Sequence, residues 1–244
     1  MSRAALVTGA GGGIGRAVAE RLIGDGFDVL SVDIKADDLP GTPHEADLTT
    51  REGNRGAVDA ALEAFGRLDV VVANAGVQHV APIDEFPEDQ WDLLLSLMLT
   101  SPFLLAKYAW DALKAADEAR YIAIASAHGL AASPYKAAYV SAKHGVIGLV
   151  RTVALEGGEA GISATAICPG YVRTPLVEGQ IPDQAKAHGL SEEEALEQVI
   201  LAPHAIKRLI EPEEIAHTVA FLASPAGAAF TGAPVIMDQG WTAR

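Results

Sequence analysis

The chain has 244 residues, of which half are hydrophobic and a fifth are charged, and its formal net charge is −14. This length suits one α/β core and is short for two domains. The negative charge argues against nucleic acid or an anionic membrane as a partner. The single cysteine, Cys168, excludes an internal disulfide framework and is typical of a cytoplasmic protein. Its apolar neighbours predict a core thiol rather than a nucleophile, and we expect no metal site.

Apolar runs alternate with helical patterns along the whole chain, without an internal repeat or a low-complexity linker. Glycines end the first run after four residues, so we expect no signal peptide. The apolar stretch 93–106 is interrupted by serine, threonine and proline, which indicates a buried or interface helix rather than a membrane span. All-apolar strands predict a single α/β domain with a doubly wound parallel sheet and helices on both faces. We expect strands at 3–8, 27–33, 43–46, 68–73, 120–126, 162–168 and 233–237, and helices at 13–25, 51–65, 88–116, 138–157 and 212–223.

A glycine-rich turn follows the first predicted strand. Gly9, Gly13 and Gly15 have the spacing T-G-x-x-x-G-x-G, and a helical pattern begins at Ile14. Such a turn lets the backbone and a helix N-terminus approach a pyrophosphate, although a tight strand-to-helix connection would need similar residues. Asp33 favours the cofactor interpretation, because an acid after the second strand can accept from the ribose 2′-OH and repel a 2′-phosphate. The sequence therefore predicts NAD, with NADP left open by the nearby Lys35.

Three further residues predict hydride transfer at a carbinol carbon. Tyr139 and Lys143 are four apart, so on a helix their side chains would lie about 6 Å from each other. A neighbouring ammonium favours the phenolate, and we expect it to lower the Tyr139 pKa enough for acid–base chemistry near neutral pH. Ser126 closes an apolar run that predicts a buried strand. Its hydroxyl would therefore lie at the carboxyl edge of the sheet, where such folds place their chemistry.

These motifs together resemble the short-chain dehydrogenase/reductase family, from about residue 3 to the C-terminus. Its N-N-A-G motif corresponds to residues 73–76 without the first asparagine, and its P-G-x-x-x-T segment corresponds to residues 169–174. The resemblance implies a Rossmann-type fold, Ser126, Tyr139 and Lys143 as catalytic residues, and a homotetramer with helices 88–116 and 138–157 at its interfaces. The cofactor residues that it and the glycine turn imply are Gly9, Gly13, Ile14, Gly15, Asp33, Asp47, Leu48, Asn74, Gly76, Tyr139, Lys143, Pro169, Gly170, Val172 and Thr174.

Polar residues outside this frame point to the substrate. A lysine, an imidazole and two amides in one cleft would suit a small carboxylate in an otherwise acidic protein. Segments 74–83, 125–136, 169–178, 180–184 and 240–243 resemble the D-3-hydroxybutyrate dehydrogenases of the family, and so imply reversible oxidation of (R)-3-hydroxybutyrate to acetoacetate. Another small hydroxy acid, or a neutral hydroxy ketone such as acetoin, is the alternative substrate. The substrate residues that the resemblance implies are Gln78, His128, Lys136, Gln180 and Trp241.

Residues 171–207 break the alternation of strands and helices after the sixth predicted strand. The segment contains three prolines and a charged helical patch that begins at Ser191, with Glu194 in a capping position. A long insertion over the carboxyl edge of the sheet is a candidate substrate lid. The alternative is a surface excursion that does not contact the substrate.

Met98 departs from the family pattern, because the position usually holds a catalytic asparagine. A redox-sensing NAD-binding protein with little turnover therefore stays an alternative, although Ser126, Tyr139 and Lys143 argue against it. Pro102 has no N–H to bond to the Met98 carbonyl. We expect that carbonyl to be free in a locally kinked helix and to bind a water on the path to Lys143.

Overall fold

The structure is a computed structural model that describes residues 2–243, except for the side chains of residues 183 and 187. Its strands are β1 (Ala4–Thr8), β2 (Asp28–Asp33), β3 (Thr42–Glu45), β4 (Val70–Ala73), β5 (Arg120–Ile124), β6 (Ser163–Pro169) and β7 (Pro234–Met237). Its α-helices are α1 (Gly13–Gly24), α2 (Arg51–Phe65), α3 (Glu88–Leu95), α4 (Ser101–Ala115), α5 (Ala137–Gly157), α6 (Pro175–Glu178), α7 (Gln180–His188), α8 (Glu192–Ala195) and α9 (Pro212–Ala223).

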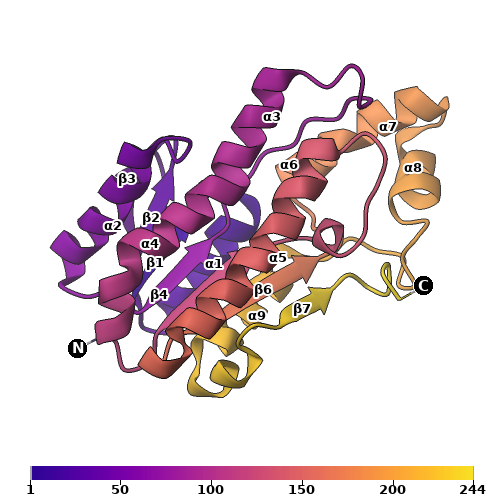
Figure 1. Cartoon of the computed structure of the whole chain (residues 1–244). Coiled ribbons are helices and arrows are strands. Elements are labelled where there is room, and N and C mark those ends of the chain that lie inside the picture. Colours follow the sequence, from indigo (N-terminus) through magenta and orange to yellow (C-terminus); the bar gives the residue numbers. More distant parts are fainter. Residues whose placement is uncertain (1, 244) are drawn as a thin grey trace.

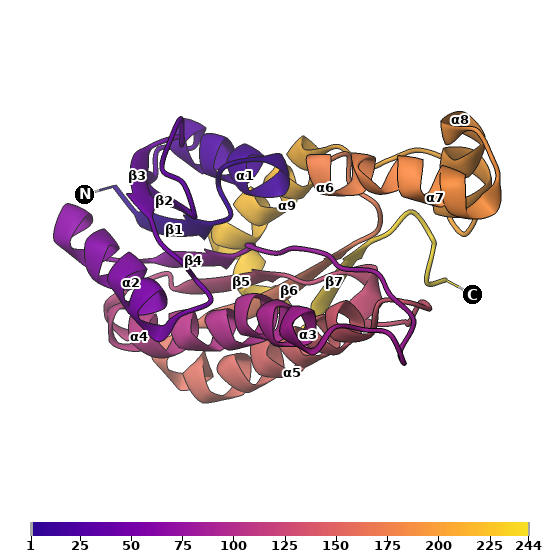
Figure 2. The ribbon, with the colours of Figure 1, turned by 90° about the horizontal axis from the view of Figure 1, so that it is seen from above.

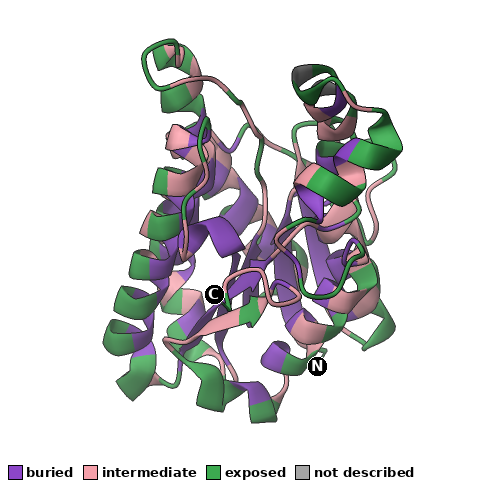
Figure 3. Ribbon diagram, turned by 90° about the vertical axis from the view of Figure 1, so that its right-hand side faces the viewer, coloured by how far each residue is buried: buried purple, intermediate pink, exposed green. Residues whose placement is uncertain are grey.

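The strands form one parallel sheet of seven strands in the order β3-β2-β1-β4-β5-β6-β7, as the sequence predicts (Figure 1). Helices α1 and α9 cover one face, and α2, α4 and α5 cover the other (Figure 2). Successive side chains of a strand point to opposite faces. In β1, Leu6 packs under α2, α4 and α5, while Ala5 and Val7 pack under α1 and α9. The central strands β1, β4, β5 and β6 are therefore buried between two layers of helices, whereas the outer strands β3 and β7 are partly exposed (Figure 3).

The predicted helix 88–116 is divided into three parts. A π-helical segment, η1 (Ser96–Thr100), separates α3 from α4, and Pro102 lies in the first turn of α4. Proline cannot donate to the carbonyl four residues back, and a π turn is one way for a helix to accommodate this loss. The continuous helix from Glu88 to Ala115 is long and apolar enough to cross a membrane, but part of it is buried inside the fold. Its inner face packs against the sheet and α5, as expected for a core helix.

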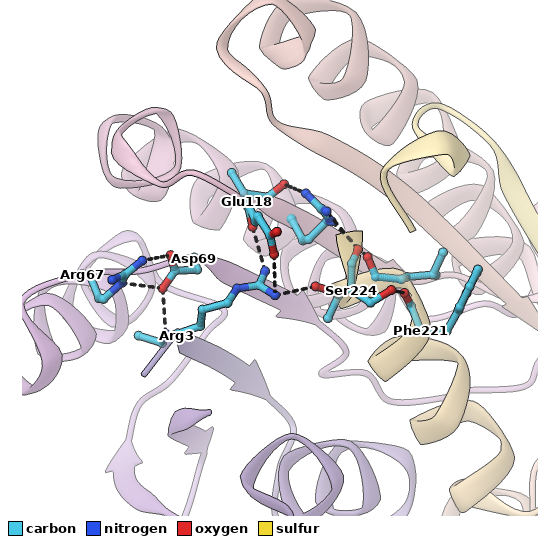
Figure 4. A network of polar contacts seen from close by, with 11 residues as sticks. Arg3, Arg67, Asp69, Glu118, Phe221 and Ser224 are labelled. Atoms are coloured by element: carbon cyan, nitrogen blue, oxygen red, sulfur yellow. Dashed lines mark hydrogen bonds and ion pairs between the residues drawn. The ribbon is translucent and has the colours of Figure 1, made fainter. Parts of the chain in front are cut away.

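Ion pairs and hydrogen bonds of arginine side chains connect the segments at the amino ends of the strands (Figure 4). Asp69 accepts from the Ala4 N–H at 2.7 Å and from two nitrogens of Arg67. The Arg3 guanidinium donates to the carbonyls of Glu118 and Ala223. Arg120, which is buried, donates to the carbonyls of Leu222 and Ser224 at the end of α9. Cations at a helix C-terminus satisfy its free carbonyls and its dipole.

Candidate active site

The glycine-rich turn joins β1 to α1 at the carboxyl edge of the sheet. Gly9 and Gly13 have φ of +68° and +51°, a region that side chains rarely adopt. A Cβ on Gly13 would lie 2.9 Å from Thr174, and one on Gly15 would lie 2.0 Å from the Gly9 carbonyl oxygen. Gly15 therefore lets the helix pack against the turn, but it does not line the cleft described below. The role of Gly15 in cofactor binding stays a prediction.

A cleft of about 630 Å³ extends from this turn along the carboxyl edge. It has the size of a small-molecule site. All the predicted cofactor residues except Gly15 line it. The sequence reasoning missed most of its other walls, which are apolar or small and resemble core residues in sequence. Those missed residues include Gly12, Ile34, Ala46, Thr49, Ala75, Val77, Leu93, Leu97, Ile124, Ala125, Pro175, Leu176 and Val177.

Asp33 and Asn74 line the cleft next to the glycine turn. The Asp33 carboxylate accepts from the N–H groups of Gly11 and Ile34, at 2.8 Å and 2.7 Å. It therefore lies directly beside the glycine turn. The Asn74 side chain donates to the Thr8 carbonyl at 2.9 Å, which ties the end of β4 to the end of β1. This cradle of backbone amides, a carboxylate and a glycine turn fits a dinucleotide.

Ser126, Tyr139 and Lys143 meet at the other end of the cleft. Ser126 follows β5, as predicted, and its hydroxyl accepts from the His128 N–H at 3.1 Å. Tyr139 and Lys143 lie one turn apart on α5, with the Lys143 ammonium 5.6 Å from the centre of the Tyr139 ring. The Lys143 Nζ donates to the Ile124 carbonyl at 2.8 Å. All three residues line the same cleft.

The expectation that Lys143 lowers the Tyr139 pKa is wrong for the ligand-free chain. Burial raises the pKa of Tyr139, and a hydrogen bond with Ser126 opposes that rise only in part. Desolvation disfavours the phenolate, and the ammonium is directed to a backbone carbonyl instead. Burial also lowers the pKa of Lys143 itself, to about 8. Burial raises the pKa of Cys168 to about 11, in agreement with a core thiol.

A smaller cavity of about 60 Å³ lies beside Ser126 and Tyr139. Its walls come from five separate parts of the chain, between residues 78 and 241. All the predicted substrate residues line it, and so do residues of α6 and α7. The segment 171–207 is therefore part of the cavity wall and not only a surface excursion. The predicted substrate residues in this wall are Gln78, His128, Lys136, Gln180 and Trp241.

The polar groups of this cavity differ in charge. Burial lowers the pKa of His128 to about 3, and the neighbouring Lys136 contributes to that decrease, so the imidazole is neutral at pH 7. Its Nε2 lies 2.9 Å from the Ser133 hydroxyl, and its ring lies 4.8 Å from the Trp241 ring. The positive charge in the cavity therefore belongs to Lys136. The Gln78 Oε1 is buried without a hydrogen-bond partner among the described residues.

Tyr171 also lines the cavity, and the sequence reasoning did not select it as a site residue. Its hydroxyl accepts from Lys136 Nζ at 3.3 Å. The only signal in the sequence was its position beside Gly170, because nothing in the residue pattern relates it to Lys136. Leu176 and Val177 close the same wall from α6.

Comparisons with known proteins agree with this fold and site. A family sequence model described as Enoyl-(Acyl carrier protein) reductase matches residues 9–242. The chain is 41% identical to a D-beta-hydroxybutyrate dehydrogenase of Rhizobium meliloti, with 100% of both chains covered. It is 37% identical to the protein of the same name from Cupriavidus necator, with 99% of this chain and 98% of the other covered.

Solved structures of other proteins have the same fold over the whole chain or nearly all of it. The ligand-free aldohexose dehydrogenase of Thermoplasma acidophilum has a TM-score of 0.93 at 27% identity, covering 100% of this chain and 95% of its own. An actinorhodin polyketide ketoreductase with NADPH has a TM-score of 0.92 at 30% identity, covering 98% of this chain and 97% of its own. The chain belongs to the short-chain dehydrogenase/reductase family, whose oxidoreductases use a nicotinamide cofactor.

Proposed function

We propose that this protein catalyses the reversible, NAD-dependent oxidation of (R)-3-hydroxybutyrate to acetoacetate. The observation that supports this most is the convergence of Gln78, His128, Lys136, Gln180 and Trp241 on one small cavity beside Tyr139. One ammonium and several neutral polar groups suit a small monocarboxylate. Two similar proteins carry the name of this activity.

The chemistry follows from the positions of the side chains. A nicotinamide cofactor bound in the cleft supplies the hydride acceptor. The Ser126 hydroxyl holds the substrate oxygen. In the direction of reduction Tyr139 gives its proton to that oxygen, and in the direction of oxidation it takes the hydroxyl proton after losing its own. Lys136, with its ammonium in the cavity, binds the carboxylate and so orients the carbinol carbon toward the cleft. Lys143 carries a proton that it can exchange near neutral pH, since its pKa is about 8.

NAD is the proposed cofactor because of Asp33. Its carboxylate lines the cleft next to the glycine turn and is positioned to accept from a ribose 2′-OH. A 2′-phosphate at that place would meet a negative charge. A preference of the wild-type protein for NADP over NAD would contradict this part of the proposal.

The proposal extends to assembly, movement and location. We propose a cytoplasmic homotetramer with helices 88–116 (α3 and α4) and 138–157 (α5) at its interfaces, and Phe103 on α4 is 45% exposed in the single chain. We also propose that α6 to α8 act as a substrate lid, since Leu176, Val177 and Gln180 form part of the cavity wall. Mass measurement in solution tests the tetramer, and a monomer with full activity would contradict it.

A panel of substrates tests the reaction. We expect turnover with (R)-3-hydroxybutyrate and NAD to exceed that with acetoin and with the S enantiomer. A charge-assisted contact contributes about 1.5–3 kcal/mol, so Lys136→Ala should raise KM for the acid roughly tenfold to over a hundredfold and leave KM for acetoin almost unchanged. Arg21→Ala, which removes a surface cation of α1, is the control. Equal losses on acid and ketone would show that Lys136 does not bind a carboxylate.

A further inference from the structure

Lys136 places its charge in the cavity from a constrained position. It immediately precedes α5, and the residue before it, Tyr135, has a φ of +66°. The lysine side chain is nearly buried, with the whole residue 8% exposed. A lysine has a flexible four-carbon chain, so holding its ammonium at one point requires a partner that fixes it.

Tyr171 provides two contacts to that ammonium. Lys136 Nζ donates to the Tyr171 hydroxyl at 3.3 Å, and it lies 5.3 Å from the centre of the Tyr171 ring. A cation within about 6 Å of an aromatic face is attracted to it. Both residues line the same cavity, so the tyrosine holds the ammonium without removing it from the substrate side.

Tyr171 is itself held on two sides. Its carbonyl accepts from the Ile210 N–H at 2.9 Å, and the next residue, Val172, forms a parallel bridge with Ile210. The ring lies 5.8 Å from that of His204, which is 1% exposed. The tyrosine therefore has a fixed backbone and a ring that is packed from behind, as a rigid support for a flexible side chain requires.

We propose that Tyr171 is a positioning residue for carboxylate recognition, which acts through Lys136 by holding its ammonium at the carboxylate end of the cavity. This inference rests on the proposed function, because it assumes an acid substrate. It adds a residue that neither the sequence pattern nor the family resemblance had assigned to carboxylate binding. Without the hydroxyl, the ammonium would sample positions from which it cannot contact the acid.

Tyr171→Phe tests this, because it keeps the ring beside His204 and removes only the hydroxyl. We expect KM for (R)-3-hydroxybutyrate to rise about 3- to 10-fold, as for the loss of one hydrogen bond, with kcat nearly unchanged. KM for acetoin and the affinity for NADH should stay within about twofold. Tyr135→Phe is the matched control, since that tyrosine is 59% exposed beside Lys136 and should change neither KM.

A double-mutant cycle separates positioning from a general structural role. In a Lys136→Met background, Tyr171→Phe should have almost no further effect on KM for the acid, because its target is absent. The same increase in both backgrounds, no increase in either, or equal losses on acid and ketone would overturn the inference. If the wild-type protein does not prefer the acid to the ketone, the proposed function has failed. If it does and the two substitutions are independent, only the role of Tyr171 has failed.

Discussion

The polar residues at the amino ends and at the carboxyl ends of the parallel strands differ in what they bind. At the amino edge, Arg3, Arg67 and Arg120 donate to a carboxylate and to backbone carbonyls (Figure 4). At the carboxyl edge, glycines leave backbone amides open to a cleft, and Lys136 and Lys143 hold positive charge without a carboxylate contact of their own in the cavity and cleft walls. At the amino ends most of the arginine nitrogens are bonded within the chain, although the buried Arg3 Nε has no partner among the described residues. At the carboxyl ends the polar side chains line a cleft and a cavity.

This difference indicates that the amino ends of the strands contribute to stability and the carboxyl ends to function. A buried charge opposes folding unless its hydrogen bonds or an opposite charge compensate the loss of water around it. Lys143 is 5% exposed and its pKa is lowered by burial, so folding acts against its charged form. Burial lowers the pKa of Arg120 as well, but its guanidinium donates to three carbonyls, whereas the Lys143 ammonium donates to one. Substitutions at the two edges should therefore have opposite consequences.

The largest effect is expected from Tyr139→Phe at the carboxyl edge. Turnover should fall by roughly 10³-fold or more, because the substitution removes the group that takes the proton. NADH binding and the melting temperature should be almost unchanged, since the ring and its packing remain. Steady-state kinetics and NADH fluorescence titration measure the two quantities. Tyr108→Phe on α4 is the control, and undiminished turnover of Tyr139→Phe would refute the mechanism.

Arg120→Met should have the opposite profile at the amino edge. The Leu222 and Ser224 carbonyls would lose their charged donor, so the free energy of unfolding should fall by about 2–4 kcal/mol. Activity per folded molecule should be retained. Urea denaturation gives the first quantity and active-site titration the second. Arg21→Met, which breaks only a surface ion pair on α1, should cost about 0.5 kcal/mol or less.

Lys143→Met should reduce turnover less than Tyr139→Phe does, and yet it should stabilise the protein measured without cofactor. The Lys143 pKa falls from 10.5 to about 8 on folding, so at pH 7 its charge opposes folding, and the substitution should add roughly 1–3 kcal/mol. Between pH 8 and 10.5 the unfolded chain binds more protons at this site than the folded chain, so wild-type stability gains on the variant as pH rises. Denaturant unfolding of both proteins at pH 7 and 9.5 measures this. A variant that is less stable at pH 7 would contradict it.

The smallest effect is expected at Asp33, where two substitutions sharpen the cofactor comparison. Asp33→Ala removes the acceptor for Gly11 and Ile34 and should raise KM for NAD about tenfold. Asp33→Asn keeps an acceptor but removes the charge, so it should mainly improve the use of NADP. Kinetics with both cofactors distinguish the two variants. An Asn variant that loses NAD without gaining NADP would show that charge repulsion does not set the choice.

The sequence predicted most of the fold because its strands are continuous apolar runs bounded by glycines and polar residues. The observed strands lie within the predicted ranges to within one or two residues at each end. Helix 88–116 is confirmed as a continuous helix over residues 88–115, and its irregularity at Ser96–Thr100 lies beside Pro102, where a kink was expected. The Met98 carbonyl and its water stay a prediction.

The site residues that could be predicted are those whose chemistry requires a particular residue type. The apolar residues of the walls could not be predicted, because buried leucines occur throughout the core. Asp33, Lys136 and Tyr139 stand out as polar residues at strand or helix ends, and each lies where it was expected. Leu97 and Leu176 line the cleft but cannot be distinguished from core leucines in a sequence. The Tyr139 pKa was predicted in the wrong direction because spacing reveals a neighbour, whereas desolvation depends on every element packed around the ring.

The last residues of the cleft and of the cavity are added to the chain at different times during translation. Every residue that lines the cofactor cleft lies between Gly9 and Val177, but the substrate cavity also needs Trp241 beside His128. As the chain leaves the ribosome, the cleft's residues are therefore all present well before the last wall of the cavity. Because α1 shares its core with α9, however, neither wall is complete until residues 212–223 have also been made.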